Sequence, residues 1–433
     1  MEPRAALSAM LSGHLVALAI SLATRLGIPD LVARRPCRVT VLARATRSHP
    51  DTLYRVLRAL AAAGVLIEHR GRRFARTGLS DLLRAGVPGS LRAPALLAGE
   101  PWRRVAYDLP AAVRRGRSPF ARAHGAGFYT YLARHPARYR LFLEAMDCHW
   151  PGLAHAVVRA GRLARARRVV DVGGGPATLM RTILEMNATA TGIVLEAPAA
   201  AARARRSLAA AGLGRRCRVV AGDFFRSVPR GGDAYVLAFV LHNWDDRRAA
   251  TILARCRTAM DAGARLLVVE MLVPADGRPT PAQVHDLEML VFTDGRERTA
   301  AEYRALLRAS GFRLRRIVAT AGGASVLEAV PAPGTFGARA VRTSTGSTPG
   351  GGTSAHRTLD RLEPIRGSGP AIEGSRGGWA RCLAATLTAR TTLQCRHERH
   401  ARRWSLRPAR IRRARAFDSH RVRRRVSPAH RGG

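Results

Sequence analysis

One histidine and two glutamates occupy places in the sequence where side chains can do proton chemistry. His242 follows an apolar run at residues 234–241, and Glu270 follows a second apolar run. A neutral histidine near pH 7 can take the proton of a phenol, whose pKa is about 10. Its other ring nitrogen needs an acceptor, for which Glu270 and Glu297 are candidates. The simpler alternatives are a histidine satisfied at a strand end, a glutamate that caps a strand, and a glutamate paired with a neighbouring arginine.

A glycine-rich turn is the second group of residues with chemical meaning. An apolar segment containing Asp171 is followed directly by Gly173, Gly174 and Gly175. Glycines let a ligand approach the backbone without a clash with Cβ, and the N-terminus of a following helix offers free N–H groups. This pattern alone is a weak signal, because NAD-dependent enzymes also use it.

Two acids after the next two strands make the signal more specific. Glu196 lies 25 residues after Asp171 and can accept hydrogen bonds from both hydroxyls of a ribose. Asp223 follows a further apolar run and can accept from an adenine amino group, with Phe224 against the ring. The order strand–glycines, strand–acid, strand–Gly–Asp indicates S-adenosylmethionine as the cofactor.

Alternating strands and helices must position these residues. Apolar runs at 168–172, 192–195, 217–221, 234–240, 264–270 and 325–330 are separated mostly by helical patterns. This alternation predicts a doubly wound parallel sheet and an α/β fold for residues 166–330. Ligands of such folds bind at the carboxyl ends of the strands, where the glycine turn and His242 are expected.

The first 100 residues predict helices and one hairpin. A helix opens at Pro50, ends at Gly64, and is followed by a short hairpin within residues 65–75. This is a winged-helix pattern, which fits either DNA binding or a dimerisation scaffold. Residues 101–165 look helical, and their interleaved aromatic side chains fit either a pocket or an ordinary helical core.

Composition argues against nucleic acid as the partner. The formal net charge is +43, but all 73 basic residues are arginine and they are scattered through the chain. We interpret this as codon usage in a GC-rich genome, since a phosphate-binding stripe would cluster its charges. The six cysteines form no CxxC pair and no zinc spacing, so we expect a reduced, cytoplasmic protein without a metal site.

The two ends of the chain differ from the rest. Residues 7–23 are apolar but interrupted by polar side chains, so we favour a buried or dimer-interface helix over a signal peptide or membrane span. Residues 331–433 are rich in Gly, Ser, Thr, Pro and Arg and predict a disordered tail. The tail is either a frameshift or read-through product or a genuine basic segment that associates with RNA or membranes.

The chain resembles the caffeate- and acetylserotonin-type O-methyltransferases, and especially their bacterial relatives in polyketide and carotenoid tailoring. The resemblance covers about residues 10–330. Its marks are Ala23–Ile28, Leu53–Leu60, Gly222–Phe225, Leu241–Asp246 and Gly295–Thr299.

The resemblance implies a fold, an activity and a set of site residues. The fold is a class I methyltransferase α/β sheet of Rossmann type with an N-terminal all-helical winged-helix domain, residues 1–100, that joins two subunits and does not bind DNA. The activity is methylation of a hydroxyl on a small aromatic or polyketide-type metabolite. His242 becomes the base and Glu270 and Glu297 its supporting acids, and Trp244 joins the cofactor residues. The implied acceptor pocket contains Phe142, Met146, His149, Asp286, Leu287 and Met289.

Four positions depart from the family pattern. Ala177 stands where a glycine is usual, and Glu196 and Asn243 stand where aspartate is usual. A basic residue often found near Ala238 is absent. The extra methyl at Ala177 and the longer Glu196 are expected to weaken cofactor binding without abolishing it.

Other functions stay open at this stage. Some members of the family have become hydroxylases or decarboxylases, but those have lost a working base, whereas His242 is retained. A nucleic-acid methyltransferase or a DNA-binding regulator would fit the charge and the winged helix. A degenerate cofactor-binding protein without activity would fit Ala177 and the unusual tail.

Overall fold

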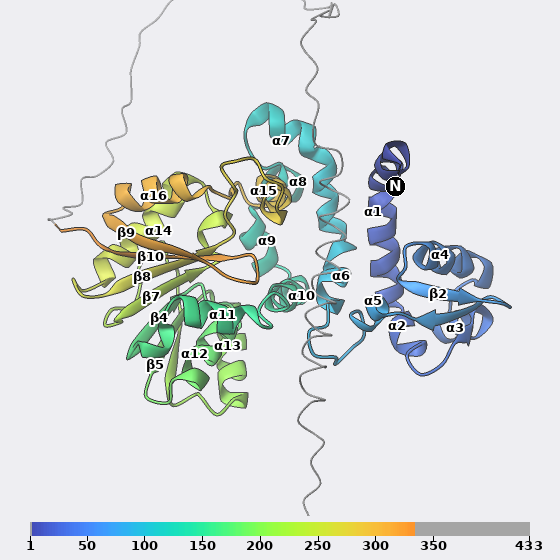
Figure 1. Cartoon of the computed structure of the whole chain (residues 1–433), viewed down its shortest axis with the longest axis horizontal. Helices are drawn as coiled ribbons and strands as arrows, with labels where there is room; N and C mark the ends of the chain where they lie inside the picture. The colour runs from blue at the N-terminus through green and yellow to red at the C-terminus, as the bar shows by residue number, and fades with distance from the viewer. Residues whose placement is uncertain (1, 334–433) are drawn as a thin grey trace, which may run out of the picture. The chain divides into compact units, whose positions relative to one another are not determined.

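This computed structural model describes residues 2–333. The C-terminal part of this range is built around a seven-stranded sheet (Figure 1). Its strand order is β6-β5-β4-β7-β8-β10-β9. The strands are β4 (Arg168–Val172), β5 (Thr191–Glu196), β6 (Cys217–Ala221), β7 (Ala234–Ala238), β8 (Arg265–Glu270), β9 (Phe312–Ala319) and β10 (Ser325–Pro331). The six apolar runs of the sequence all lie on strands of this sheet.

The sheet is mixed, which corrects the expectation of an all-parallel sheet. Strands β4 to β8 pair in parallel, but β10 is antiparallel to both β8 and β9. Only a short turn joins β9 to β10, and a connection that short can make a hairpin but no parallel crossover. Strand β9 was not predicted, because three arginines in Phe312–Ala319 conceal its apolar residues.

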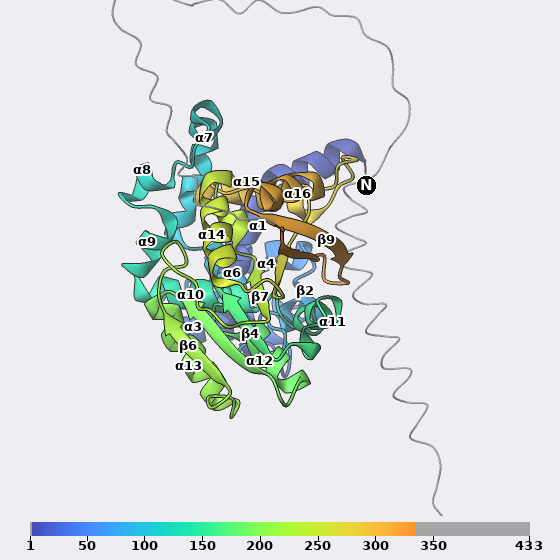
Figure 2. The ribbon, with the colours of Figure 1, turned by 90° about the vertical axis from the view of Figure 1, so that its left-hand side faces the viewer.

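Helices cover both faces of the sheet (Figures 1 and 2). Side chains of a strand alternate between faces, so Val169 packs with α11, α12 and α13, while Val170 packs with α14 and α16. The bounds are α11 (Leu153–Ala160), α12 (Thr178–Met186), α13 (Pro198–Ala210), α14 (Asp246–Ala259), α15 (Pro281–Phe292) and α16 (Ala300–Ala309), with 3-10 turns η2 (Leu163–Arg165) and η3 (Leu241–Asn243). This is the doubly wound arrangement that the alternating pattern predicted.

Short helices between residues 92 and 147 surround an aromatic core. They are α6 (Arg92–Ala98), η1 (Pro101–Asp108), α7 (Leu109–Arg115), α8 (Phe120–His124), α9 (Phe128–Ala133) and α10 (Pro136–Asp147). Trp102, Phe120, Phe128 and Phe292 pack edge to face or tilted, with ring centroids 5.3 to 6.3 Å apart. Phe128 and Phe120 therefore belong to a helical core, and only part of this aromatic set lies near the site described below.

The N-terminal region is a small helical unit with a sheet of its own. It contains α1 (Pro3–Arg25), α2 (Ile28–Leu31), β1 (Cys37–Arg38), α3 (Val39–Thr46), α4 (Pro50–Ala62), β2 (Leu66–His69), β3 (Arg73–Arg76) and α5 (Gly78–Asp81). The predicted hairpin is β2–β3, and β1 extends it to three strands, so the description as all-helical needs this correction.

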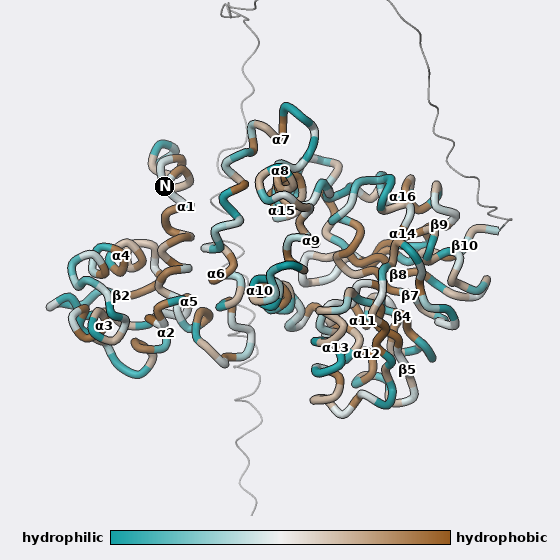
Figure 3. Tube along the Cα trace, turned by 180° about the vertical axis from the view of Figure 1, so that it is seen from behind, coloured by the Kyte–Doolittle hydropathy of each residue, from teal (hydrophilic) through white to brown (hydrophobic). Residues whose placement is uncertain are grey.

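Helix α1 leaves most of its apolar surface uncovered. Only Ser21, Ala23 and Thr24 are buried, whereas Leu11 and Leu15 are 69% and 60% exposed. Figure 3 shows apolar residues along this helix. Among the described residues, α1 is also the one helix long and apolar enough to cross a membrane by length and composition.

Candidate active site

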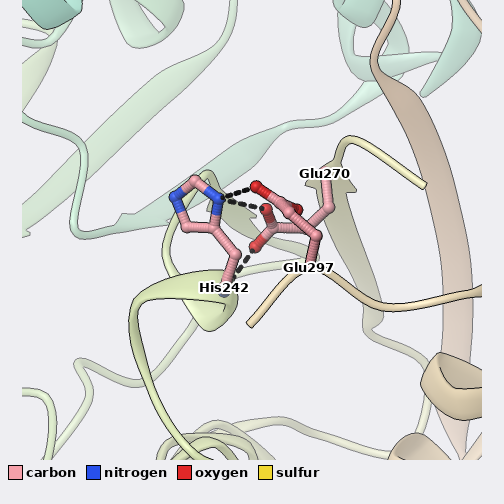
Figure 4. A group of neighbouring side chains, drawn as sticks. All are labelled: His242, Glu270 and Glu297. Atoms are coloured by element: carbon pink, nitrogen blue, oxygen red, sulfur yellow. Dashed lines mark hydrogen bonds and ion pairs between the residues drawn. The ribbon is translucent and has the colours of Figure 1, made fainter. Parts of the chain in front are cut away.

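Three elements bring His242, Glu270 and Glu297 together at the carboxyl end of the sheet (Figure 4). His242 lies in η3, directly after β7, and Glu270 is the last residue of the adjacent strand β8. Glu297 comes from the loop that follows α15. Neighbouring parallel strands end at the same edge, so β7 and β8 place His242 and Glu270 together. Glu297 reaches them from the loop after α15, which is far from both in sequence.

Hydrogen bonds fix the geometry of this group. Nδ1 of His242 lies 2.8 Å from Oε1 of Glu297 and 3.6 Å from Oε2 of Glu270. Oε1 of Glu270 accepts from the backbone N–H groups of Leu241 and His242 at 2.9 and 3.3 Å. Nδ1 therefore carries the proton toward Glu297, and Figure 4 shows the second ring nitrogen, Nε2, pointing away from both carboxylates.

Burial and charge act against each other on the histidine. Burial by itself lowers the pKa of His242, but Glu270 and the hydrogen bond to Glu297 outweigh it and raise the pKa to about 9. Burial raises the pKa of the Glu270 carboxyl, with the negative charge of Glu297 acting in the same direction. The imidazole is therefore charged near pH 7, which corrects the neutral form expected from the sequence. It acts as a base at higher pH, and the two carboxylates stabilise the imidazolium that forms when it takes a proton.

The glycine turn after β4 is shaped to receive a ligand. Gly173 has φ of +76°, and a Cβ atom at Gly174 would meet Oδ2 of Asp171 at 2.5 Å. The Asp171 carboxyl is 1% exposed, and among the described residues neither of its oxygens has a hydrogen-bond partner. Burial and the charge of Glu196 raise the pKa of Asp171 to about 7. A buried carboxyl with two unpaired oxygens suits a ligand that brings hydrogen-bond donors or positive charge.

The other predicted cofactor residues lie around this turn. Oε2 of Glu196 accepts from the N–H of Gly175 at 3.1 Å, so the carboxylate is held against the turn. Asp223 is half exposed, and its Oδ1 accepts from the N–H of Phe225 at 2.8 Å. The Phe224 ring lies close to Gly173 and packs edge to face on Trp244. A carboxylate held at the turn, an exposed carboxylate at Asp223 and the nearby Phe224 ring fit a nucleoside.

Comparisons with known proteins identify the family. An O-methyltransferase domain model matches residues 106–313, and a model of the O-methyltransferase dimerisation domain matches residues 8–86. The phenazine O-methyltransferase of Lysobacter antibioticus is 41% identical over 322 residues, which cover 74% of this chain and 94% of that protein. The mitomycin biosynthesis 6-O-methyltransferase of Streptomyces lavendulae is 37% identical over 317 residues, covering 72% and 90%.

The chain belongs to the O-methyltransferase family. A solved structure of human N-acetylserotonin methyltransferase in complex with S-adenosylmethionine matches with a TM-score of 0.71 and 26% identity, over 77% of this chain and 98% of that one. S-adenosylmethionine is accordingly the cofactor of this methyltransferase, as the order of strands, glycines and acids predicted. The match at residues 8–86 also shows that the winged-helix region is an O-methyltransferase dimerisation domain.

An aromatic wall of the methyltransferase stands beside the cofactor turn. Trp244 stacks on Tyr129 with ring centroids 5.5 Å apart, and it packs edge to face on Phe225 at 4.8 Å. Phe142 lies 6.3 Å from Tyr129. Burial raises the pKa of the Tyr129 hydroxyl, and the charges of Glu196 and Glu270 act in the same direction. Tyr129 therefore lies within the electrostatic influence of both Glu196 and Glu270.

The residues predicted for the acceptor pocket do not all gather in one place. Phe142 belongs to the aromatic wall, but Met146, His149 and Leu287 are exposed in the single chain. Oδ1 of Asp286 accepts from the backbone N–H of Glu297 at 2.8 Å, so it holds the acid that supports His242. Met289 accepts from the Thr293 hydroxyl near the end of α15. For these residues an acceptor contact remains a prediction.

Two residues near the base were missed by the sequence reasoning. Phe239 has φ of +56°, unusual for an aromatic residue, and its ring lies 6.0 Å from His242 and 5.8 Å from Trp150. Arg298 is 1% exposed and contacts the loop that carries His242. A positive φ leaves no trace in an apolar run, and one buried arginine among 73 basic residues gives no compositional signal.

The departure at Ala177 has a conformational explanation. Ala177 precedes α12 with φ of +67°, a conformation that favours glycine. Its methyl group is fully buried in the core cluster formed with α11 and α12. The methyl thus packs into the protein core and not beside the cofactor turn, which corrects the expectation from the sequence. The consequence of alanine at this position is local backbone strain.

Proposed function

We propose that this enzyme transfers the methyl group of S-adenosylmethionine to a hydroxyl of a small aromatic or polyketide-type secondary metabolite, with His242 as general base. The observation that carries the proposal is the orientation of the imidazole. Nδ1 is bonded to Glu297, and Nε2 points away from both carboxylates. Only that second nitrogen is available to a hydroxyl.

The division of labour among the residues follows from their positions. When bound, the cofactor supplies an electrophilic methyl on a sulfonium. Glu196 and the turn at Gly173–Gly175 hold and orient the nucleoside, and His242 accepts the hydroxyl proton at Nε2. Glu270 and Glu297 then stabilise the charged imidazole. Most of the remaining rate enhancement comes from holding the two reactants in line, an effect worth roughly 7–11 kcal/mol in well-oriented systems.

The strength of the base suits a phenolic acceptor. A phenol has a pKa of about 10, and the pKa of His242 is raised to about 9. Proton transfer between groups so close in pKa is nearly balanced, so a small additional stabilisation of the phenolate completes it. An aliphatic alcohol is a much weaker acid, and the same base would leave it protonated.

The surroundings of the base favour a flat acceptor. Tyr129, Trp244 and Phe142 present ring faces and edges beside the site. Such walls suit planar aromatic ligands. The relatives named for phenazine and 3-amino-4-hydroxybenzoate act on aromatic rings, which supports the same class of acceptor here.

The direct test is a labelled-methyl assay. Enzyme and S-adenosylmethionine carrying a ¹³C methyl are incubated with hydroxyphenazines, hydroxybenzoates and, for comparison, aromatic amines and aliphatic alcohols. We expect O-methyl products from the phenolic group, detected by mass spectrometry. Labelled products confined to the amines or alcohols would overturn the proposal.

A cofactor-dependent reaction without methyl transfer is the second candidate. A relative from Streptomyces purpurascens, 35% identical over 309 residues, is named aclacinomycin 10-hydroxylase. Acceptor turnover that requires S-adenosylmethionine but leaves its methyl in place would favour this alternative. The anchored imidazole at His242 favours methyl transfer, because hydroxylation has no need of a base in that position.

We further propose a homodimer formed through the N-terminal domain. The exposed leucines of α1 need a cover in water, and the dimerisation-domain match at residues 8–86 includes most of this helix. A second copy of the chain covers them in our proposal, in keeping with a cytoplasmic enzyme. The tail was predicted at residues 331–433; Pro331 is the last residue of β10, and residues 334–433 lie outside the described residues.

A further inference from the structure

The segment Gly295–Arg298 lies against the loop that carries His242. The N–H of Arg296 donates to the carbonyl oxygen of His242 at 2.8 Å. A Cβ atom at Gly295 would meet that same oxygen at 2.0 Å and the carbonyl carbon of Asn243 at 2.6 Å. Only glycine allows so close an approach, so two stretches distant in sequence are in direct backbone contact beside the base.

The side chain of Arg298 extends this contact on both sides of the histidine. Its NH1 donates to the carbonyl of Leu241 at 3.2 Å, and its NH2 donates to the carbonyl of Trp244 at 2.8 Å. Nε donates to Oδ1 of Asp246 at 2.8 Å. One planar guanidinium thus binds the residue before His242, a residue after it and the first residue of α14.

The energy cost of burying Arg298 is not balanced by its ion pair with Asp246. Arg298 is 1% exposed, while its ion-pair partner Asp246 is 61% exposed at the side chain. A buried guanidinium loses hydration, and pairing with a largely hydrated carboxylate returns little of that energy. The Tyr303 ring lies 5.6 Å from the guanidinium carbon, and the remaining partners are backbone carbonyls. Two of these carbonyls, of Leu241 and Trp244, flank His242, so the buried arginine is bound to the loop that carries the base.

We propose that Arg298 is a positioning residue that holds the loop on both sides of His242 in register with Glu297. The proposal rests on the proposed role of His242 as the base. Arg298 itself touches backbone carbonyls, Asp246 and the ring of Tyr303, so it acts through the histidine.

The charges around His242 define the expected sign. Glu270 from β8 and Glu297 from the loop after α15 raise its pKa, whereas Arg298 lowers it. Tyr129 on α9 and Tyr303 on α16 lie near Glu270, and burial raises the pKa of both phenols, so they stay neutral. Removal of the Arg298 charge should therefore raise the pKa of His242, and the enzyme should need a higher pH to reach full activity.

The experiment compares pH profiles of kcat/KM in the full-length enzyme. Arg298→Gln removes the charge, Arg298→Lys keeps it without the three-way geometry, and Asp246→Asn leaves Arg298 in place with less compensation. Arg296→Gln is the matched control, because its side chain is half exposed and its closest acidic partner is Glu302, with Asp246 farther away at 3.8 Å. Melting temperature and S-adenosylmethionine affinity are measured for each variant.

We expect Arg298→Gln to lower kcat about tenfold or more, with little change in cofactor affinity. The rising limb of its kcat/KM profile, where activity increases with pH, should move to higher pH by roughly one unit. Arg298→Lys should lower kcat but leave the limb near its original place, and Asp246→Asn should move the limb slightly to lower pH. Arg296→Gln should behave as wild type.

Two outcomes would overturn the inference. One is a rising limb of the kcat/KM profile that stays at the same pH in both Arg298→Gln and Asp246→Asn. If Arg298→Gln does not fold, the result for the surface substitution Asp246→Asn decides by itself. The other is an unchanged kcat in Arg298→Gln. Failure of the proposed base shows separately, as full activity in a variant that lacks His242.

Discussion

Oε1 of Glu297 lies 2.8 Å from Nδ1 of His242, although 55 positions separate the two residues. This contact fixes the ring orientation, and it places a buried negative charge where an imidazolium would form. Asp286 accepts from the backbone N–H of Glu297 and keeps that acid in place. The ring orientation is therefore set before an acceptor arrives, and Nε2 becomes a proton acceptor once the imidazole is deprotonated.

Replacement of the proposed base should slow turnover while cofactor binding stays intact. His242→Ala should lower kcat by roughly 10²–10⁴-fold, the usual range for loss of a general base. Calorimetry should give an unchanged S-adenosylmethionine affinity, since the turn at Gly173 is untouched. The control is His155→Ala, which removes an exposed histidine of α11. Equal turnover in His242→Ala and wild type would mean that proximity alone accounts for catalysis.

The pH dependence should follow the raised pKa of His242. A base acts when deprotonated, so kcat/KM should rise with pH, reach half its maximum near pH 9 and level off above it. Glu297→Gln removes a charge that favours the imidazolium, so the limb should move to lower pH and the maximal rate should fall. Steady-state kinetics between pH 6 and 10 measures both. A limb that moves to higher pH in Glu297→Gln would contradict the assigned electrostatics.

The strained backbone at Ala177 predicts an asymmetric response to substitution. Ala177→Val adds a β-branched side chain at positive φ in a fully buried place and should lower the free energy of unfolding by about 2–3 kcal/mol. In Ala177→Gly, relief of about 1 kcal/mol of strain is offset by the loss of a buried methyl, worth ~0.8 kcal/mol. That variant should be nearly neutral in chemical denaturation.

The control for Ala177 is Ala209→Val on α13, at an exposed position with ordinary helical geometry. It should cost less than about 1 kcal/mol. Equal destabilisation by the two valine substitutions would show that the positive φ carries no energetic penalty.

The apolar face of α1 should govern assembly. Leu11→Asp combined with Leu15→Asp places two charges on the exposed stripe and should convert a dimer into a monomer in light scattering after size exclusion. Val113→Asp, on a similarly exposed residue of α7 outside the matched dimerisation domain, is the control. A dimer that survives the double substitution would place the interface elsewhere.

Activity should not require a metal ion. Ligand atoms of His242, Glu270 and Glu297 lie within 4.8 Å of one another, a spacing that a metal could also use. Nδ1 of His242 is already bonded to Glu297, however, and the base needs that bond to orient its ring. Dialysis against a chelator should leave kcat unchanged. A loss of activity that returns with a divalent cation would contradict this.

Much of the cofactor site can be predicted from the sequence because its parts are local. The glycines come just after Asp171, Glu196 ends β5 and Asp223 follows β6, so apolar runs and spacing are enough to place them at one edge of a sheet. The position of His242 follows from the same reasoning. Proteins of this architecture build such edges from short stretches in which strand and turn are continuous in sequence.

Other features depend on how distant segments meet. The antiparallel β10, the contact of Gly295 with the His242 carbonyl, and the role of Asp286 under Glu297 involve residues far apart in the chain. No period or spacing encodes such a contact, because its distance is set by the packing of whole helices and strands.

The sequence by itself therefore determined the family, the cofactor and the identity of a candidate base, since these reside in short motifs with chemically distinctive residues. The tertiary structure decided the tautomer and charge of that base and the buried arginine that holds its loop. Protonation and orientation depend on which charges lie within a few ångströms in a desolvated interior, and only the folded chain brings Glu297, Arg298 and His242 to that distance.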